Sequence, residues 1–250
     1  MKYAGIAAVI GLCAVFAAPA RGAEIVILAN QGAISGLRDL APAFEKATGD
    51  KVVVKFKVGA EMTKAIDDNE PADIVSNLFE GFPDLVKRGK VVAGSFAEFA
   101  RAGNGVAVRA GAPKPDISTP EAFKQAMLNA KSIGHSDNGT GPFNTAVFKR
   151  LGIYDQIKDK IKIINGTPVA RVVAEGGVEI GIQQTNVIQP VPGADYVGPL
   201  PAELTEYGHF GMGVLTISKA PDAARAFIAF ATSPEAAPLL RKSAMEPPAK

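Results

Sequence analysis

The chain has 250 residues, of which 47% are hydrophobic, 27 are Lys or Arg, 25 are Asp or Glu and one is Cys. A formal net charge of +2 excludes the strong basic field on which proteins that bind nucleic acid or membrane surfaces depend. The single Cys excludes a disulfide framework within the chain.

The first residues have the pattern of a secretory signal peptide. Lys2 supplies a positive start, residues 3–16 form an apolar run, and small residues follow it. The apolar run is too short to span a bilayer. Cleavage after Ala20, Gly22 or Ala23 fits the pattern, which does not choose among these three sites.

Loss of a signal peptide at residues 1–23 changes the composition that matters for function. It removes Cys13, Lys2 and Arg21, so the 27 basic residues become 25 and equal the 25 acidic ones. We therefore predict a periplasmic protein with a net charge near zero and no thiol. No later apolar run approaches the roughly 20 residues that cross a bilayer.

Strand and helix patterns alternate along the first hundred residues, beginning with a Gly-rich polar loop after the first strand. In chain order, the predicted elements are strand 24–28, helix 35–48, strand 51–57, helix 61–68, strand 72–76 and helix 82–88. Strands separated by helices of this length predict right-handed βαβ units and a parallel sheet.

A second series begins near residue 100. Its predicted elements are strand 106–109, a helix from 118, strand 132–135, helix 143–151, strand 160–164, helix 168–175, strand 179–183, strand 209–218, helix 221–231 and a last helix from 233. The mature chain is long enough for two lobes. We predict an α/β fold of two lobes, each a mostly parallel sheet flanked by helices, with a ligand cleft where the strand ends face each other.

The sequence lacks the common catalytic motifs. It has no H-E-x-x-H, G-x-S-x-G, P-loop or G-x-G-x-x-G pattern, and the mature histidines are His135 and His209. A nucleophile and base would have to come from His135 with Ser136 or Thr140. We predict a binding protein rather than an enzyme, with no catalytic residue, metal site or cofactor.

Four segments carry a family resemblance. They are Phe44-Glu-Lys-Ala-Thr-Gly49, Val52-Val-Val54, Pro71-Ala-Asp-Ile-Val-Ser76 and Ala226-Phe-Ile-Ala-Phe-Ala-Thr-Ser-Pro-Glu-Ala236. The chain resembles the molybdate-binding-protein-like group of periplasmic solute-binding proteins of ABC importers, over roughly residues 24–246. The resemblance implies two lobes joined by a two-strand hinge, with residues 24–98 and 209–250 in one lobe and 99–208 in the other.

The ligand loops depart from the pattern of that family. Where molybdate binders carry a small hydroxyl residue in the first loop, this chain has Gly32, and its second loop, Lys57-Val-Gly-Ala60, also lacks hydroxyl donors. Thr140 and Gln184 stand near the family's alanine and tyrosine positions. Because a tetrahedral oxyanion needs converging N–H and O–H donors, these exchanges argue against molybdate or tungstate.

Polar residues at strand ends form the predicted ligand site. Its predicted members are Asn30, Gln31, Gly32, Lys57, Gly59, Asn77, Ser136, Thr140 and Gln184, with Asn138 and Gln183 beside them. Lys57 is predicted to pair with a carboxylate or phosphate, and the alternative is a solvated strand end.

These observations together predict a monomeric periplasmic protein that captures a small anion, an organic carboxylate, for an ABC permease. The alternatives are a molybdate-type oxyanion binder and a ligand-sensing partner of a receptor kinase.

Overall fold

The computed structural model describes residues 22–57, 59–137 and 140–248. The predicted signal peptide, except for its last two residues, lies outside this part of the chain, and so does Asn138. In the described ranges no helix is long and apolar enough to cross a membrane.

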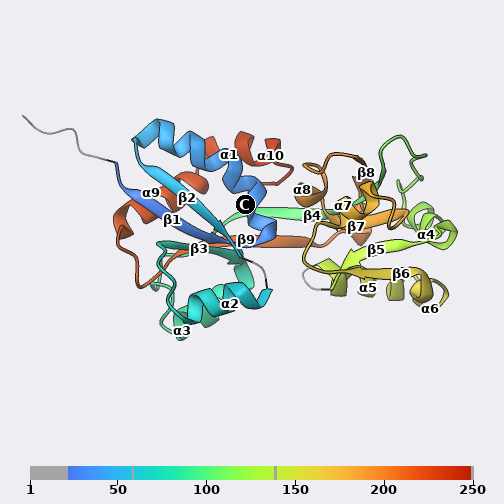
Figure 1. The fold of residues 1–250 in the computed structure, drawn as a ribbon, viewed down its shortest axis with the longest axis horizontal. Helices are drawn as coiled ribbons and strands as arrows, with labels where there is room; N and C mark the ends of the chain where they lie inside the picture. The colour runs from blue at the N-terminus through green and yellow to red at the C-terminus, as the bar shows by residue number, and fades with distance from the viewer. Residues whose placement is uncertain (1–21, 58, 138–139, 249–250) are drawn as a thin grey trace, which may run out of the picture.

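The strands of the described chain form one sheet that runs through the whole molecule (Figure 1). They are β1 (Glu24–Ala29), β2 (Lys51–Phe56), β3 (Ile74–Leu78), β4 (Ala97–Arg109), β5 (Ile133–Ser136), β6 (Ile161–Ile164), β7 (Ile180–Gln184), β8 (Ala194–Pro199) and β9 (Tyr207–Val214). The order across the sheet is β2-β1-β3-β9-β4-β7-β5-β6, and β8 pairs with β4. β1 runs parallel to β2 and β3, and β5 runs parallel to β6 and β7. Each end of the sheet is therefore parallel, as two βαβ series predict.

Helices pack on both faces of this sheet. They are α1 (Gln31–Thr48), α2 (Gly59–Asp67), α3 (Phe82–Lys87), α4 (Pro120–Asn129), α5 (Thr140–Arg150), α6 (Tyr154–Ile157), α7 (Val169–Ala174), α8 (Thr185–Ile188), α9 (Pro221–Ala231) and α10 (Ala237–Lys242). Around β1 and β3, one core packs beneath α1 and α9 with Leu37 and Phe227, and another packs beneath α2 and α3 with Met62 and Phe82. The far end of the sheet has a separate core under α4, α5 and α6.

Two strands connect the two lobes. The first part of β4 pairs antiparallel with β9, and its second part pairs with β7 and β8. Figure 1 shows β4 and β9 passing from one lobe to the other. The two-lobed α/β fold is thus confirmed, with these strands as its connection. The predicted lobe limits at 98/99 and 208/209 fall inside β4 and β9 and stay predictions.

The chain's C-terminal segment anchors this connection. Arg101 on β4 and Glu246 exchange backbone hydrogen bonds of 2.8 Å in both directions, and Arg101 Nη2 donates to Glu246 Oε2 at 2.7 Å. The Arg101 guanidinium also lies 4.4 Å from the ring centre of Tyr207 on β9. The last described residues therefore hold both connecting strands together.

Helix α1 begins at Gln31, earlier than the predicted start at Ser35. Asn30 is the N-cap, and its Oδ1 accepts the N–H of Ala33 at 2.9 Å. A cap of this kind satisfies one of the first N–H groups, which have no partner within the helix. The stretch predicted to be a loop is therefore the first turn of a helix. α2 and α5 also begin earlier than predicted.

Among the strands and α-helices of the described residues, four stretches were not predicted: the first half of β4, β8, α6 and α8. Gly103-Asn-Gly105 has the pattern of a turn, but it continues strand β4. A Cβ atom at Gly105 would lie 2.6 Å from the ring of Tyr196, so this glycine makes room for an aromatic side chain on β8. β9 ends at Val214 rather than at Ser218, and it begins two residues before its predicted start.

Candidate ligand-binding cleft

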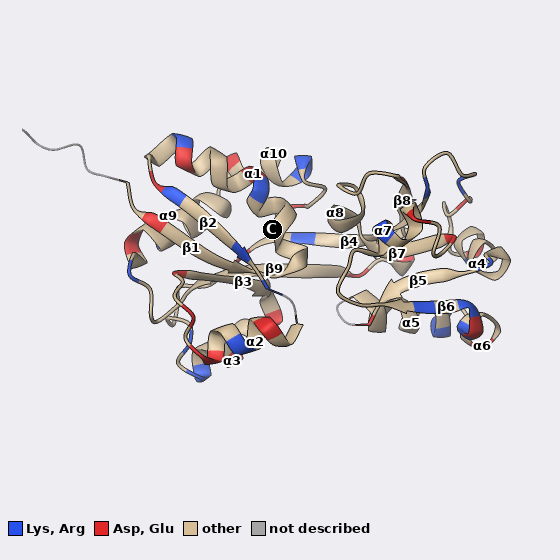
Figure 2. Ribbon diagram, in the orientation of Figure 1, with Lys and Arg blue, Asp and Glu red and all other residues tan. Residues whose placement is uncertain are grey.

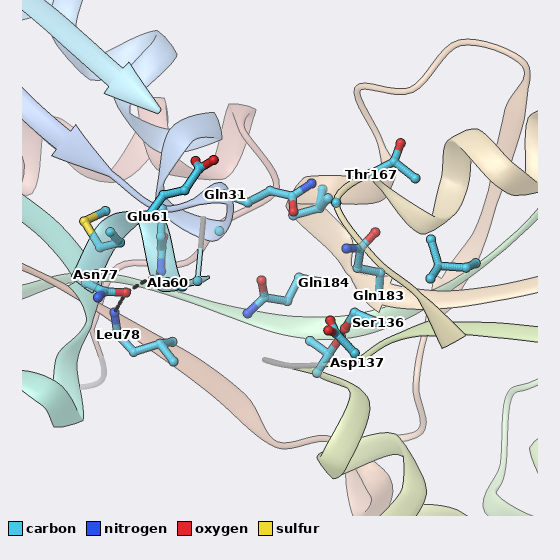
Figure 3. A pocket seen from close by; sticks show the side chains of 18 of the residues that line it. Gln31, Ala60, Glu61, Asn77, Leu78, Ser136, Asp137, Thr167, Gln183 and Gln184 are labelled. Carbon is cyan, nitrogen blue, oxygen red and sulfur yellow. Dashed lines mark hydrogen bonds between the residues drawn. The ribbon is translucent and has the colours of Figure 1, made fainter. Parts of the chain in front are cut away.

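A cavity of about 550 Å³ lies between the lobes, at the C-terminal ends of β1, β3, β5, β6 and β7 (Figure 3). Its lining is mostly amide, hydroxyl and glycine residues: Asn30, Gln31, Gly32, Gly59, Ala60, Glu61, Met62, Asn77, Leu78, Ser136, Asp137, Thr140, Ile164, Gly166, Thr167, Gln183, Gln184, Val187 and Phe210. Figure 3 shows Gln31 and Asn77 on one side and Gln183 and Asp137 on the other, with Gln184 reaching into the space between them.

The start of α1 forms one wall. Besides capping the helix, Asn30 donates from Nδ2 to Asn77 Oδ1 at 2.8 Å, and its own N–H donates to the Ser76 carbonyl at 3.1 Å. Asn30 is thus used to hold β1, β3 and α1 together. The N–H groups of Gln31 and Gly32 are the first two of the helix and have no carbonyl partner within it. They lie at the positive end of the 18-residue helix, which favours an anion.

Gly32 is required by close packing. A Cβ atom there would lie 2.4 Å from two ring carbons of Phe210 and 2.9 Å from Gln184 Oε1. Phe210 is 1% exposed and belongs to the core beneath α1. Position 32 therefore has no room for a hydroxyl side chain, because the Phe210 ring occupies the space beside it.

The start of α5 forms the opposite wall. Thr140 is its first residue, and its Oγ1 lies 3.1 Å from Ser136 Oγ at the end of β5. A Cβ atom at Gly141 would lie 1.9 Å from the Ser136 carbonyl oxygen, so the helix can approach the strand only with glycine there. Beside them, Asn165 donates its amide to both carboxylate oxygens of Asp137 at 3.0 Å, in the orientation that satisfies its neighbours.

Two glutamines complete this side. Gln183 is 6% exposed, and its Oε1 accepts the N–H of Val169 at 2.8 Å, at the start of α7. Gln184 Nε2 lies 2.6 Å from where a Cβ atom would stand on Gly208. Gln184 therefore occupies space that Gly32 and Gly208 leave open, and its amide faces the cavity.

The charge of the cavity comes from acidic side chains. Glu61 and Asp137 line it, and among its described lining residues there is no Lys, Arg or His. Figure 2 shows residues of both signs on the helices of both lobes. Within the cavity, any attraction for an anion therefore depends on backbone N–H groups, side-chain amides and hydroxyls.

Lys57 does not line the cavity. Its Nζ lies 2.7 Å from Glu70 Oε2, and this hydrogen bond lowers the pKa of the Glu70 carboxyl. β2 is the edge strand of the sheet, and Lys57, directly after it, is paired with Glu70 near the surface. The geometry gives no support to the predicted pairing of Lys57 with a ligand. It also differs from the alternative, a solvated strand end, because the Lys57 ammonium is paired with Glu70.

His135 does not form the nucleophile–base pair considered from the sequence. It is 2% exposed, and its Nδ1 lies 2.8 Å from the backbone carbonyl of Ser136. Burial lowers the pKa of this imidazole. Its Nε2 has no hydrogen-bond partner in the described part of the chain. Within the same part, no group of three His, Cys, Asp or Glu residues is arranged to hold a metal ion.

The structure brings eight of the nine predicted site residues to one cavity, all except Lys57. Their contact with a ligand stays a prediction. The prediction did not include Glu61, Asp137, Gly166, Thr167 and Phe210. Gly166 and Thr167 lie shortly after the end of β6, as other site residues lie after the ends of their strands. Their position after a strand could therefore have identified them from the sequence. Phe210 comes from antiparallel β9, which gives no such signal.

Comparison with known proteins finds relatives over nearly the whole chain. A family model described as bacterial extracellular solute-binding protein matches residues 25–246. An aconitate isomerase from a Pseudomonas species is 33% identical over 229 residues, 89% of this chain and 87% of that protein. The molybdate-binding protein ModA of Azotobacter vinelandii is 25% identical over 236 residues, 90% of each chain.

Solved structures share the fold. The substrate-binding domain of a putative molybdenum ABC transporter from Clostridium difficile superposes with a TM-score of 0.73 at 15% identity, covering 91% of this chain and 100% of that one. The resemblance to molybdate-binding periplasmic proteins is therefore confirmed for the family and the fold.

Proposed function

Because the chain belongs to the bacterial extracellular solute-binding proteins, we propose that its cavity binds a small organic polycarboxylate in the periplasm for delivery to an ABC permease. The observation that carries this proposal is the meeting of three helix starts, those of α1, α2 and α5, at one cavity lined by amides and hydroxyls. N–H groups at helix starts bind carboxylates without a basic side chain.

The cavity supports an organic ligand over a tetrahedral oxyanion. A volume of about 550 Å³ lies in the range of sites for small organic molecules. The side chains that reach into it are long amides such as Gln31 and Gln184, which read separate polar groups of an extended ligand. A compact oxyanion would leave most of these amides without a partner.

The relative that is 33% identical narrows the ligand class. Its name contains aconitate, an unsaturated tricarboxylate, whereas the relative named for molybdate is 25% identical. The higher identity to the relative named for aconitate supports a tricarboxylate or a similar polycarboxylate as the ligand.

A thermal-shift and calorimetry panel tests the proposal. We expect trans-aconitate, cis-aconitate or citrate to raise the melting temperature, because a ligand that binds only the folded state stabilises it by about 2.7 kcal/mol at 100 times its Kd. Molybdate and sulfate should have no effect. A shift with molybdate and none with any carboxylate would refute the proposal.

A pair of glutamine variants tests the site. Gln184→Leu should weaken carboxylate binding about tenfold or more, since a hydrogen bond to a charged group contributes about 1.5–3 kcal/mol. Gln125→Leu is the control, because Gln125 is exposed on α4 and bonds only to Glu121 in the described hydrogen-bond network. Equal affinities of both variants and the wild type would exclude Gln184 from the site.

A second candidate function is isomerisation of an unsaturated tricarboxylate. It is favoured by the similarity to aconitate isomerase and by the two carboxylates that line the cavity, Glu61 and Asp137. In such a reaction a base removes a proton from the methylene carbon and the double bond shifts by one carbon. A proton then returns to the former vinyl carbon, so no co-reactant is needed. Glu61 and Asp137 are the candidates for the base and the acid.

Proton NMR in D₂O separates the two candidates. Isomerisation converts trans-aconitate into cis-aconitate with deuterium entering the methylene group, and Asp137→Asn or Glu61→Gln should slow it at least about 100-fold. Gln125→Leu should convert at the wild-type rate. Binding with no conversion would refute the isomerase and leave the solute-binding proposal standing.

A further inference from the structure

Asn186 makes polar contacts between the two lobes. It lies in α8, two residues after Gln184, and is 1% exposed. Its Nδ2 donates to the Gly32 carbonyl at 2.6 Å and to Ser35 Oγ at 2.7 Å. These partners lie more than 150 residues earlier, in the first two turns of α1.

Helix α8 otherwise packs with the far lobe. It contacts β4, β7, β8 and α7, and the helix it meets from the other lobe is α1. Figure 1 shows α8 at the margin of its lobe that faces α1. The side chain of Asn186 therefore joins the two segments that supply N–H and amide donors to the cavity from opposite sides.

We propose that Asn186 is a positioning residue of the ligand site, which fixes the start of α1 at a set distance from Gln183 and Gln184 before a ligand arrives. Gly32 contributes an N–H to the cavity while its carbonyl is held by Asn186, so the hydrogen bond fixes the residue next to the ligand. Preorganised donors bind more tightly because their ordering is not paid at the moment of binding.

The other end of the same amide argues against a purely structural role. Asn186 Oδ1 is buried and has no hydrogen-bond partner in the described part of the chain. A buried acceptor without a partner destabilises the fold and offsets part of what the two hydrogen bonds of Asn186 contribute. Stability alone therefore gives little reason for an amide at this position, whereas its hydrogen bonds determine where α1 begins relative to α8.

Asn144 offers a matched control. It is also 1% exposed, and its amide contacts Asn104 Nδ2 at 3.0 Å and the Ile182 carbonyl at 3.4 Å, all within the far lobe. Asn144→Leu removes a buried amide without touching the contact between the lobes.

Two measurements on the full mature chain test the inference. In the first, we expect Asn186→Leu to weaken trans-aconitate binding about tenfold, because the donors at the start of α1 must then be ordered when the ligand binds. Asn144→Leu, which also loses buried hydrogen bonds, should lower the melting temperature but leave the affinity unchanged. Unchanged affinity of Asn186→Leu would overturn the inference, whatever its melting temperature.

The second measurement does not rest on the proposed ligand. Without any ligand, hydrogen exchange of the Ser35 and Gly36 amides, in the first turns of α1, should be about tenfold faster in Asn186→Leu and unchanged in Asn144→Leu. Ser35→Ala, which removes one of the two hydrogen bonds, should give a smaller increase even if the leucine variant fails to fold. Unchanged exchange in Asn186→Leu or, where it does not fold, in Ser35→Ala would overturn the inference, whereas faster exchange without aconitate binding would refute only the proposed function.

Discussion

Replacing Gly32 by Ala reverses the expectation from helix propensity. Gly32 is the second residue of α1, and Ala is normally more stable than Gly within a helix by about 0.5–1 kcal/mol. The structure places the new Cβ atom 2.4 Å from two Phe210 ring carbons. Carbon atoms in contact are about 3.5 Å apart, so the ring or the helix start would have to move by about 1 Å.

The size of the effect follows from where Phe210 lies. The ring is 1% exposed in a packed core, so it has little room to move, and overpacking of this kind costs about 1–3 kcal/mol. We expect Gly32→Ala to lower the free energy of unfolding by that amount. It should also weaken ligand binding, because the N–H of residue 32 moves with the helix start.

Urea denaturation with a second glycine as control measures this. Gly81 has φ of −79°, and a Cβ atom there would meet nothing within 4 Å, so Gly81→Ala should be neutral or stabilising. Gly32→Ala combined with Phe210→Leu should be more stable than the two separate losses predict, by at least about 0.5 kcal/mol. If Gly32→Ala is as stable as Gly81→Ala and the losses are additive, the packing argument is wrong.

Two further substitutions test other features. Asp73→Asn should lower the free energy of unfolding by about 2–3 kcal/mol at neutral pH, because the carboxylate accepts the N–H of Val26 at 2.9 Å and the hydroxyl of Ser218 at 2.7 Å. Burial alone would raise the pKa of Asp73, but these hydrogen bonds hold the pKa below the ordinary value of an aspartate. The stabilisation is therefore present above the pKa of the unfolded state and lost as the pH falls through the lower folded pKa, so denaturation curves of wild type and variant should converge in acid. Lys57→Ala should cost less than about 1 kcal/mol, since its ion pair with Glu70 is partly exposed, and calorimetry should find carboxylate affinity unchanged. A loss of affinity in this variant would return Lys57 to the site.

Most of the order of elements could be predicted because most elements carry a local signal. The helix over residues 221–231 has the predicted bounds, since Pro221 marks its start and Phe227 and Ile228 fall on one buried face. Helix starts in the ligand region were predicted too late. Glycine lowers helix propensity, so Gly32 and Gly141 argue locally against a helix. The reason for each glycine, close contact with the Phe210 ring or with the Ser136 carbonyl, cannot be recognised from the neighbouring sequence.

The site could be predicted as a set of strand ends but not as a set of contacts. Asn77 and Ser136 end parallel strands, and the fold brings such ends together. Lys57 also follows a parallel strand, but its partner Glu70 comes after a separate helix and turn, so sequence spacing could not reveal the ion pair. Asn186 could not be predicted from sequence spacing either, because its partners are Gly32 and Ser35 in the other lobe.

We expect backbone groups to select the charge of the ligand and side chains to select its identity in this cavity. Three helix starts carry a glycine, and each glycine has its own physical reason: contact with a ring at Gly32, contact with a carbonyl at Gly141, and a φ of +43° in open space at Gly59. Backbone N–H groups at helix starts favour a negatively charged ligand. The side chains of Gln31 and Gln184 line the same cavity, and we expect their amides to distinguish one anion from another. The family resemblance therefore predicts that an anion binds, while the side chains between the helix starts decide which one.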